Sequence, residues 1–356
     1  MLIRNQLDDI EGVICSTSNL LADVVMMIDK NHGGTVLCVD PVGKLMGTIT
    51  DGDVRRGLIQ GCTLSTVVSQ VMNTSYKSCK PMDDLEVIDQ VFKLNKINCL
   101  PIVADDDKLL GAYTKDETMT SSALPALEAV IPVIMAGGKG KRLLPLTEKC
   151  PKPLLKIGDK PMLQIILEKI AETGFRKIFI SVGYLADKII EFVDSELELD
   201  LEVFYIFEET PLGTAGALSS LSQENGISYL IINGDVLTDL NLYTFLNFHI
   251  DSHAKMTIAS RLVCTQVPYG VIQCDDQGWI SSVEEKPNVS HKVSAGVYLL
   301  ESSVLNLIPR SAQFDMPDLI NACIESEFRV MNFPIHERWI DIGLPRTLQE
   351  ARDKWG

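Results

Sequence analysis

Several features that would assign the 356-residue chain to common protein classes are missing from its sequence. The nine cysteines are scattered and form no C-x-x-C pair, so a zinc or thioredoxin-type site has no support. An odd number of cysteines fits a reducing compartment better than a disulfide framework. No apolar stretch approaches the roughly 18 residues that a membrane span needs, and acidic residues near the start interrupt any signal-peptide pattern. We therefore expect a cytoplasmic protein without a membrane partner.

Basic residues are also scarce, with 32 Lys and Arg against 48 Asp and Glu, for a formal net charge of −16. A general nucleic-acid binder would present a basic patch, so the charge balance argues against a nucleic-acid partner. It does not exclude small anionic ligands, because a local group of basic side chains and backbone N–H groups can outweigh the global charge. The length predicts at least two domains.

The first third of the chain contains an internal repeat. Lys-Leu-Met-Gly-Thr-Ile-Thr at 44–50 recurs as Lys-Leu-Leu-Gly-Ala-Tyr-Thr at 108–114. Each copy follows an apolar, β-branched run, at 35–39 and 99–103, and an acidic turn. The pattern predicts two copies of one unit. The predicted organisation is a tandem module at 1–120 (about 8–60 and 68–120), a linker at 121–128 and a second domain at 129–356.

Strands and helices alternate in the second domain. Apolar runs at 129–135, 177–182 and 229–232 read as buried strands. Amphipathic helices are expected from Pro161 to Gly174 and at 186–193, the first with proline and glycine as its start and stop signals. This alternation predicts an α/β fold with a Rossmann-like, mostly parallel sheet and helices on both faces. Ligands in such sheets bind at the carboxyl ends of the strands.

A glycine-rich loop follows the first of these strands, with the sequence Ala136-Gly137-Gly138-Lys139-Gly140-Lys141-Arg142. Glycines at this point let backbone N–H groups approach a phosphate closely, and Lys152 in the following Pro-Lys-Pro adds positive charge. The loop fits no Walker A pattern. It is not a dinucleotide fingerprint either, because Leu143 stands where the third glycine would be. The sequence therefore predicts a phosphate-binding loop of another type.

Six short motifs follow one another between about residues 130 and 350. They are Gly-x-Gly-x-Arg-Leu-x-Pro-Leu-Thr at 138–147, Pro-Lys-Pro at 151–153, Leu-Gly-Thr-Ala-Gly at 212–216, Asn-Gly-Asp at 233–235, Glu-Glu-Lys-Pro at 284–287 and Trp-Ile-Asp-Ile-Gly at 339–343. In this order they resemble the signature of the sugar-1-phosphate nucleotidyltransferases, which include glucose-1-phosphate thymidylyltransferase and mannose-1-phosphate guanylyltransferase. The resemblance implies an enzyme that joins a sugar 1-phosphate to a nucleoside triphosphate (NTP) and releases pyrophosphate.

The resemblance also implies a role for each matching residue. Ala136, Gly137, Gly138 and Gly140 would cradle the NTP phosphates, and Arg142 and Lys152 would be the catalytic cations. Gly213 and Thr214 would belong to the nucleobase pocket, with Glu209 as a candidate for reading the base edge. Asp235 and Asp341 would hold Mg²⁺. Sugar and sugar-phosphate contacts would come from Tyr269, Gly270, Glu285, Lys286, Ala295 and Gly296.

The chemistry of the reaction accounts for these residue types independently. Transfer at phosphorus needs mainly positioning and charge compensation from the protein. Mg²⁺ retains water and needs only one or two carboxylates besides the substrate phosphates. The attacking phosphate oxygen is already ionised, so no general base is required.

Residues 47–56, Gly-Thr-Ile-Thr-Asp-Gly-Asp-Val-Arg-Arg, resemble the end of a CBS motif. By this resemblance Thr50 and Asp53 would contact the phosphate and ribose of an adenine or guanine nucleotide. The second copy keeps Thr114 but has Glu117 at the position of Asp53. Paired CBS motifs imply one pseudo-symmetric α/β module and make a homo-oligomer plausible. A module that only dimerises or tethers the enzyme is the alternative interpretation.

The substrate assignment comes from two resemblances. The segment from Glu208 to Gly216 is most similar to the guanylyltransferase version, which favours GTP. The CBS-plus-transferase arrangement resembles the glucosamine-1-phosphate guanylyltransferases of legionaminic acid biosynthesis, so glucosamine 1-phosphate is favoured over its N-acetyl form and mannose 1-phosphate. Two alternatives stay open: the same enzyme using UTP, dTTP or CTP, and a nucleotide-sensing regulatory protein whose transferase domain is inactive.

Overall fold

The computed structural model describes residues 2–6, 10, 12–30, 34–95, 97–115 and 127–355. The chain divides into two compact units, Met1–Ser121 and Ser122–Gly356. Each unit has its own sheets and its own buried apolar side chains. None of the helices in these described ranges is long and apolar enough to cross a membrane.

The N-terminal unit contains two three-stranded sheets, in the orders β2-β3-β4 and β1-β6-β5. Its strands are β1 (Leu2–Gln6), β2 (Ile14–Ser16), β3 (Thr35–Val39), β4 (Leu45–Thr50), β5 (Cys99–Val103) and β6 (Leu109–Lys115). Its helices are α1 (Leu21–Lys30), α2 (Asp51–Ile59) and α3 (Leu85–Asn95). The two predicted apolar runs are therefore β3 and β5, with the expected boundaries.

The two copies of the repeat share the same backbone irregularity. The antiparallel ladder of β3 and β4 has one extra residue, Met46, on its second strand, and the ladder of β5 and β6 has Leu110 at the equivalent place. Both side chains are partly exposed, at 39% and 41%. The same β-bulge therefore occurs at one register position in 44–50 and in 108–114.

The C-terminal unit is built on a seven-stranded sheet in the order β11-β10-β7-β12-β17-β14-β18. Strands β11, β10, β7 and β12 are parallel, whereas β17 runs antiparallel to both of its neighbours. The strands of the sheet are β7 (Val130–Met135), β10 (Lys177–Val182), β11 (Glu202–Phe207), β12 (Ser228–Asn233), β14 (Met256–Gln266), β17 (Asn288–Glu301) and β18 (Val330–Pro334). This is the predicted mixed α/β architecture with a mostly parallel central sheet.

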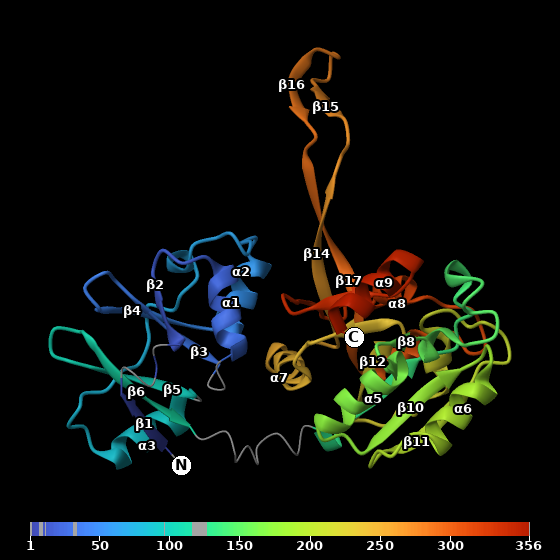
Figure 1. Ribbon diagram of the computed structural model, residues 1–356, viewed down its shortest axis with the longest axis horizontal. Helices are drawn as coiled ribbons and strands as arrows, with labels where there is room; N and C mark the ends of the chain where they lie inside the picture. The colour runs from blue at the N-terminus through green and yellow to red at the C-terminus, as the bar shows by residue number, and fades with distance from the viewer. Residues whose placement is uncertain are drawn as a thin grey trace. The chain divides into compact units, whose positions relative to one another are not determined.

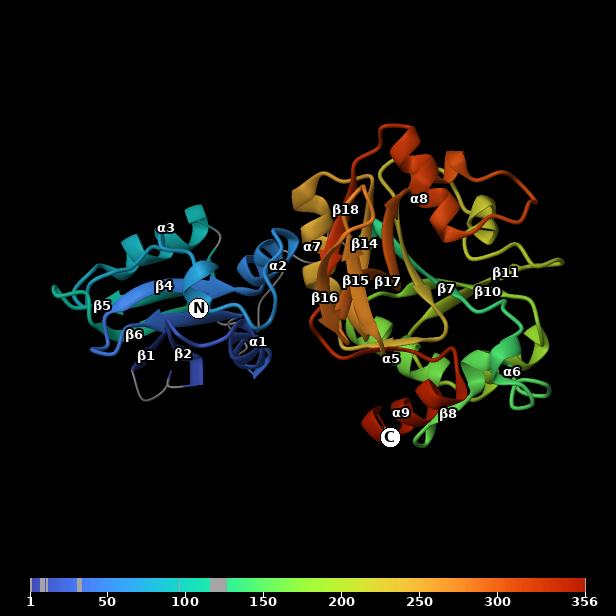
Figure 2. The same ribbon diagram turned by 90° about the horizontal axis from the view of Figure 1, so that it is seen from above.

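Helices cover both faces of this sheet, as Figure 2 shows for α8 on one side and α5 and α6 on the other. Side chains alternate between the two faces along each strand, so Val133 packs with the α8 side and Ile134 with the α5 side. The helices of the unit are α5 (Met162–Glu172), α6 (Ala186–Ser195), α7 (Leu242–Ser252), α8 (Met316–Glu325) and α9 (Pro345–Trp355).

Helix α5 begins and ends where the sequence predicts. Pro161 is its N-cap, and Gly174, just beyond the end of the helix, adopts a left-handed φ of +97° that a side chain would disfavour. Its apolar stripe is buried against the sheet, through Met162, Leu163, Ile166, Leu167 and Ile170. The helix thereby fixes the position of the preceding loop, which carries Lys152.

Two strands continue beyond the sheet as an exposed arm. β14 and β17 stay paired as far as Gln266 and Asn288, and the hairpin of β15 (Gly270–Cys274) and β16 (Ile280–Glu285) forms the end of the arm. Figure 1 shows this hairpin at the far end of the β14–β17 ribbon, away from the helices that cover the sheet. Nothing in the sequence pattern predicts this extension.

Candidate active site

A cavity of about 330 Å³ lies where β7 and β12 end. This is the edge at which parallel α/β sheets bind ligands. Its lining includes nine residues for which the sequence predicts a role: Ala136, Gly137, Gly138, Gly140, Arg142, Lys152, Gly213, Thr214 and Asp235. Side chains and loops far apart in the sequence thus converge on one pocket.

The glycine-rich loop after β7 requires glycine at two positions for different reasons. Gly140 has a φ of +60°, and a Cβ there would lie 2.9 Å from the Thr147 side chain. A Cβ at Gly137 would lie 2.2 Å from Oε1 of Glu208. Gly138, in contrast, faces open space, with no atom within 4 Å of a Cβ position. The loop therefore packs tightly at both ends and leaves its middle accessible to a ligand.

Lys152 and Arg142 are cationic residues of the cavity lining. The Lys152 ammonium forms an ion pair with Oδ2 of Asp235, and the two side chains are only 12% and 27% exposed. Arg142 follows the glycine-rich loop in a 3₁₀ turn (Lys141–Leu143), and a Cβ at Gly343 would lie 3.0 Å from its guanidinium nitrogen. Both cations thus lie on the wall of one cavity.

Asp341 lies beside Asp235 on a neighbouring short strand. β13 (Val236–Thr238) pairs with β19 (Trp339–Asp341), and the Ile342 N–H donates to the Asp235 carbonyl at 2.9 Å. Partial burial raises the pKa of Asp341, and the negative charge of Asp235 raises it further. The Lys152 and Arg142 cations oppose this effect.

A pair of carboxylates that repel one another is a suitable partner for a divalent cation. Among the described residues, no group of three or more His, Cys, Asp or Glu side chains comes together as a metal site. Asp235 and Asp341 therefore fit Mg²⁺ only as the type of site that takes its remaining ligands from water and substrate phosphates.

Of the two neighbouring glutamates, Glu208 lines the cavity, whereas Glu209 is exposed and does not line it. Ser181 donates its hydroxyl to Glu208 Oε1 at 2.5 Å, and the Leu212 N–H donates to Oε2 at 3.2 Å. The sequence alone does not show which of the two neighbouring glutamates turns inward, because both follow the last residue of β11. The predicted residue Glu209 thus lies outside the cavity lining, and its neighbour Glu208 lies within it.

The residues predicted to bind the sugar phosphate fall into two groups. Tyr269, Gly270, Glu285 and Lys286 come together across the arm, where Gly270 pairs with Glu285 and the Lys286 N–H donates to the Tyr269 carbonyl at 3.2 Å. All four are exposed, and none lines the cavity. The extension of β14 and β17 beyond the sheet carries these residues away from the strand ends. The structure therefore does not show the predicted sugar pocket around them.

Ala295 and Gly296 lie in the sheet, close to the cavity but not in its lining. Gly296 has a φ of +73°, and a Cβ there would lie 2.9 Å from the Asn233 amide nitrogen. The Ala295 carbonyl accepts a hydrogen bond of 2.8 Å from the Trp339 indole N–H. Both residues support the turns that carry Asp235 and Asp341.

The predicted nucleotide contacts of the N-terminal unit have partners within the chain. Thr50 caps α2, and its hydroxyl donates to Asp53 Oδ2 at 2.7 Å, while Arg56 donates to Asp53 Oδ1 at 2.5 Å. Thr114 lies on β6. Glu117 lies outside the described residues. A nucleotide that contacts Asp53 would have to compete with these interactions.

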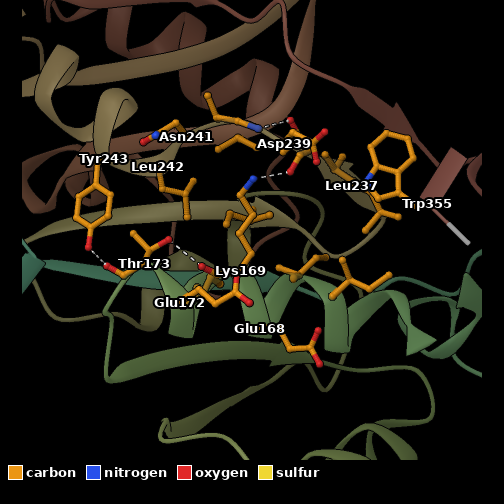
Figure 3. A pocket seen from close by; sticks show the side chains of 18 residues that line it. Glu168, Lys169, Glu172, Thr173, Leu237, Asp239, Asn241, Leu242, Tyr243 and Trp355 are labelled. Atoms are coloured by element: carbon orange, nitrogen blue, oxygen red, sulfur yellow. Dashed lines mark hydrogen bonds between the residues drawn. The ribbon is translucent and has the colours of Figure 1, made fainter. Parts of the chain in front are cut away.

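A larger cavity, of about 470 Å³, lies between α5 and the segment from β13 to α7 (Figure 3). Its cation, the partly buried Lys169, already donates to the Thr238 carbonyl at 2.7 Å, and burial lowers its pKa. The carboxylates of Glu168, Glu172 and Asp239 also line this cavity. Such a charge pattern disfavours phosphate, so the smaller cavity is the better candidate for the chemistry.

Comparison with known families agrees with this geometry. The family model described as nucleotidyl transferase matches residues 131–355, and the CBS domain model matches residues 68–120. The first repeat copy, at about 8–60, lies outside the CBS match.

Two curated relatives are enzymes that use sugar 1-phosphates. The UTP–glucose-1-phosphate uridylyltransferase of Synechocystis is 30% identical over 230 residues, which are 59% of this chain and 59% of that protein. The mannose-1-phosphate guanylyltransferase catalytic subunit beta of Drosophila pseudoobscura is 32% identical over 220 residues, which are 60% of this chain and 59% of that protein. The chain thus spans about three fifths of the length of these relatives.

A solved structure is similar over the C-terminal unit. HddC from Yersinia pseudotuberculosis, in a crystal structure complexed with GMP-PN, is 27% identical and superimposes with a TM-score of 0.50. The match covers 64% of this chain and 99% of that protein. Because the family model spans more than half of the sequence and the strand-end cavity has the matching residues, the chain belongs to the nucleotidyl transferase family and carries a CBS domain in its N-terminal unit.

Proposed function

We propose that the chain transfers a nucleotidyl group from an NTP to a hexose 1-phosphate and releases pyrophosphate, with GTP and glucosamine 1-phosphate as the favoured substrates. The observation that carries the proposal is the convergence of an open glycine loop, the Lys152–Asp235 ion pair and Arg142 on one cavity at the strand ends. The comparisons support the reaction class, since the relatives join sugar 1-phosphates to nucleotides. A regulatory domain without transferase activity would not need all of these groups on one cavity.

The reaction needs one bond to form and one to break. An ionised oxygen of the sugar phosphate attacks the α-phosphorus of the NTP, and the bond from the α-phosphorus to the bridging oxygen breaks. Pyrophosphate leaves with that electron pair, and the nucleotide-sugar keeps the α-phosphate. No proton has to be removed, because the second ionisation of a phosphate monoester has a pKa of about 6.

The chain's own groups position and neutralise the reacting phosphates. Gly138 faces open space, so a triphosphate can approach the backbone of the loop there. Lys152 is held by Asp235 when no nucleotide is bound, and an arriving triphosphate offers it a second anionic partner. Arg142 adds a planar, bidentate donor at the same cavity. Mg²⁺, held by Asp235 and Asp341 when bound, would supply further charge compensation for the phosphates.

Glu208 supports guanine as the base. A carboxylate accepts hydrogen bonds only, and guanine presents two neighbouring donors, N1–H and the N2 amino group. Ser181 and Leu212 hold the two Glu208 oxygens and leave lone pairs of each for a ligand. The guanylyltransferase relative and the GMP-PN complex of HddC are in line with this choice, whereas the uridylyltransferase relative favours the alternative with UTP.

The sugar side of the proposal rests on the arm. Lys286 would meet the phosphate of the sugar, and Glu285 its hydroxyl groups, with Tyr269 and Gly270 beside them on the paired strand. Binding at these residues requires the arm to bend towards the strand ends, because none of them lines the cavity. An amino sugar would add a positive charge for Glu285, which favours glucosamine 1-phosphate.

Nucleotide binding at the N-terminal unit is a separate part of the proposal. An adenine or guanine nucleotide would bind near Thr50, Asp53 and Thr114 and change the rate of transfer, which requires two states with different affinities. Thr50→Val in the full chain would remove one proposed contact and the α2 cap together. A matched Thr63→Val variant, at an exposed threonine outside the helix, controls for the loss of a hydroxyl.

The experiment that tests the proposal measures pyrophosphate release by the full chain with Mg²⁺. Each of the nucleotides GTP, UTP, dTTP, CTP and ATP is combined in turn with each of four sugar 1-phosphates, those of glucosamine, N-acetylglucosamine, mannose and glucose. Activity with GTP and an amino sugar supports the full proposal. Activity with another NTP keeps the reaction class and overturns the role of Glu208. Silence in every combination, repeated with adenine and guanine nucleotides as activators, overturns the transferase proposal and favours the regulatory protein.

A further inference from the structure

The loop that carries Gly213 and Thr214 is fastened to the start of α8, about a hundred residues further along the chain. The Thr214 N–H donates to Asp315 Oδ1 at 2.9 Å, and its hydroxyl donates to the same oxygen at 3.3 Å. In return, the Met316 N–H donates to the Thr214 hydroxyl at 2.7 Å. Thr214 and Asp315 therefore form a reciprocal clasp between two segments.

Backbone contacts reinforce the clasp. The Phe314 N–H donates to the Leu212 carbonyl at 2.9 Å, and the Phe314 carbonyl accepts from the N–H groups of Ala215 and Gly216, both at 3.0 Å. Gly213 has a φ of +79°, and a Cβ there would lie 2.6 Å from Asp315 Oδ1. The loop thus lies flat on the turn before α8, and only glycine allows this approach.

The clasp is complete without any substrate. The N–H groups in the first turn of a helix have no partner within the helix, and the Thr214 hydroxyl supplies one for Met316 from another part of the chain. That hydroxyl donates once and accepts once, so its hydrogen-bonding capacity is largely used. Asp315, although it holds this loop, does not line the cavity.

The same loop is held at its other end by the base-reading candidate, since the Leu212 N–H donates to Glu208 Oε2. We propose that Asp315 is a positioning residue: through Thr214 it fixes the part of the cavity wall formed by Gly213 and Thr214, and so sets NTP affinity and base discrimination without touching the substrate. The inference rests on the proposed function only in requiring that this cavity binds an NTP.

The test measures GTP and UTP binding by titration calorimetry with the full chain, together with kcat and KM for pyrophosphate release. Asp315→Ala is expected to raise Kd and KM for GTP about tenfold, the loss of about one hydrogen bond to a charged group. The kcat should stay within about twofold, because Lys152 and Arg142 are untouched. Asp315→Asn keeps an acceptor oxygen for Thr214 and should recover most of the affinity.

A variant on the loop side checks the same clasp. Thr214→Val removes the hydroxyl but keeps the backbone N–H bond to Asp315, so it should also raise Kd and KM for GTP. If Asp315→Ala folds poorly, Asp315→Glu decides the question, because it keeps the charge but displaces the acceptor oxygen from Thr214 and should still raise Kd for GTP.

The inference is overturned if these variants bind GTP as tightly as the wild type, with the same preference over UTP. A fall in kcat at constant KM would also overturn it, because that pattern indicates displaced catalytic groups. If the wild type itself binds neither nucleotide, the proposed function fails first, and the inference fails with it.

Discussion

Lys152 and Asp235 form an ion pair across the candidate active site, although 83 residues separate them in the sequence. One comes from the Pro-Lys-Pro turn before α5 and the other from the turn after β12. The pair brings a cation for the transferred phosphate next to a carboxylate proposed to hold Mg²⁺. Because the two charges pair, neither is left unpaired when no ligand is bound.

Loss of either partner should remove transfer activity. Lys152→Ala is expected to lower kcat by about 10²-fold or more, because one charge-compensating donor at a developing anion has that value. Lys152→Arg should recover part of the lost kcat, because it keeps the positive charge. Asp235→Asn should lower kcat by a similar factor and weaken the dependence of the rate on Mg²⁺ concentration. Steady-state pyrophosphate release measures each effect, and a substantial rate with Asp235→Asn would remove this carboxylate from the mechanism.

The glycine-rich loop offers a matched pair of substitutions. In Gly137→Ala the new methyl group would displace the Glu208 carboxylate from Ser181 and Leu212, and we expect about 2 kcal/mol of destabilisation from the loss of those bonds. Gly138→Ala meets open space, so its stability should stay within about 0.5 kcal/mol of the wild type.

Urea unfolding followed by tryptophan fluorescence is a suitable measurement for this pair, because all three tryptophans lie in the C-terminal unit. The double variant Gly137→Ala/Glu208→Ala should be no less stable than Glu208→Ala alone. Equal destabilisation by both single glycine variants would contradict the close packing of Glu208 on the loop.

Glu208 and Glu209 form a second matched pair. Glu208→Gln replaces one acceptor oxygen by a donor facing the donors of guanine, so KM for GTP should rise about tenfold or more. KM for UTP, where it is used, should change less. Glu209→Gln should leave both values unchanged, since its side chain is exposed and lies outside the cavity lining. The reverse outcome would return the base-reading role to Glu209.

Stability should fall in mild acid because of His249 on α7. This side chain is buried and contacts the Thr257 hydroxyl at 2.7 Å. Burial lowers the pKa of His249 to about 4, and nearby Lys255 acts in the same direction against the opposing charge of Glu301. The unfolded chain therefore binds a proton between about pH 6.5 and pH 4 that the folded chain does not bind.

The contribution of neutral His249 to the free energy of unfolding is fully present above pH 6.5. It is lost as the pH falls towards 4. At pH 5 the loss from this group is about 2 kcal/mol. Urea midpoints at pH 7.5 and pH 5.0 should therefore shift more for the wild type than for His249→Asn, which keeps a polar group beside Thr257. Equal shifts in the two proteins would show that other groups cause the acid sensitivity.

Local signals in the sequence predict much of the fold. The apolar runs at 35–39, 99–103 and 177–182 become β3, β5 and β10, and the helix opened by Pro161 ends before Gly174. These elements follow from periodicity and from proline and glycine at their ends. The convergence of Arg142, Lys152 and Asp235 on one cavity also follows, since loops after parallel strands meet at one edge of a sheet.

Other features depend on contacts that no local pattern reveals. Whether Glu208 or Glu209 turns inward depends on how β11 ends against Ser181 of the neighbouring strand. The Asp315–Thr214 clasp joins residues 101 positions apart. The arm arises because β14 and β17 stay paired beyond the sheet, so Glu285 and Lys286 lie where their motif alone does not place them.

The most direct test of the central claim is identification of the products by phosphorus NMR and mass spectrometry, with the full chain, Mg²⁺, GTP and glucosamine 1-phosphate. The account predicts equal amounts of pyrophosphate and a nucleotide diphosphate sugar, with neither formed when the sugar phosphate is left out. Release of free GMP without a sugar product, or no turnover with any NTP although nucleotide binds, would contradict it.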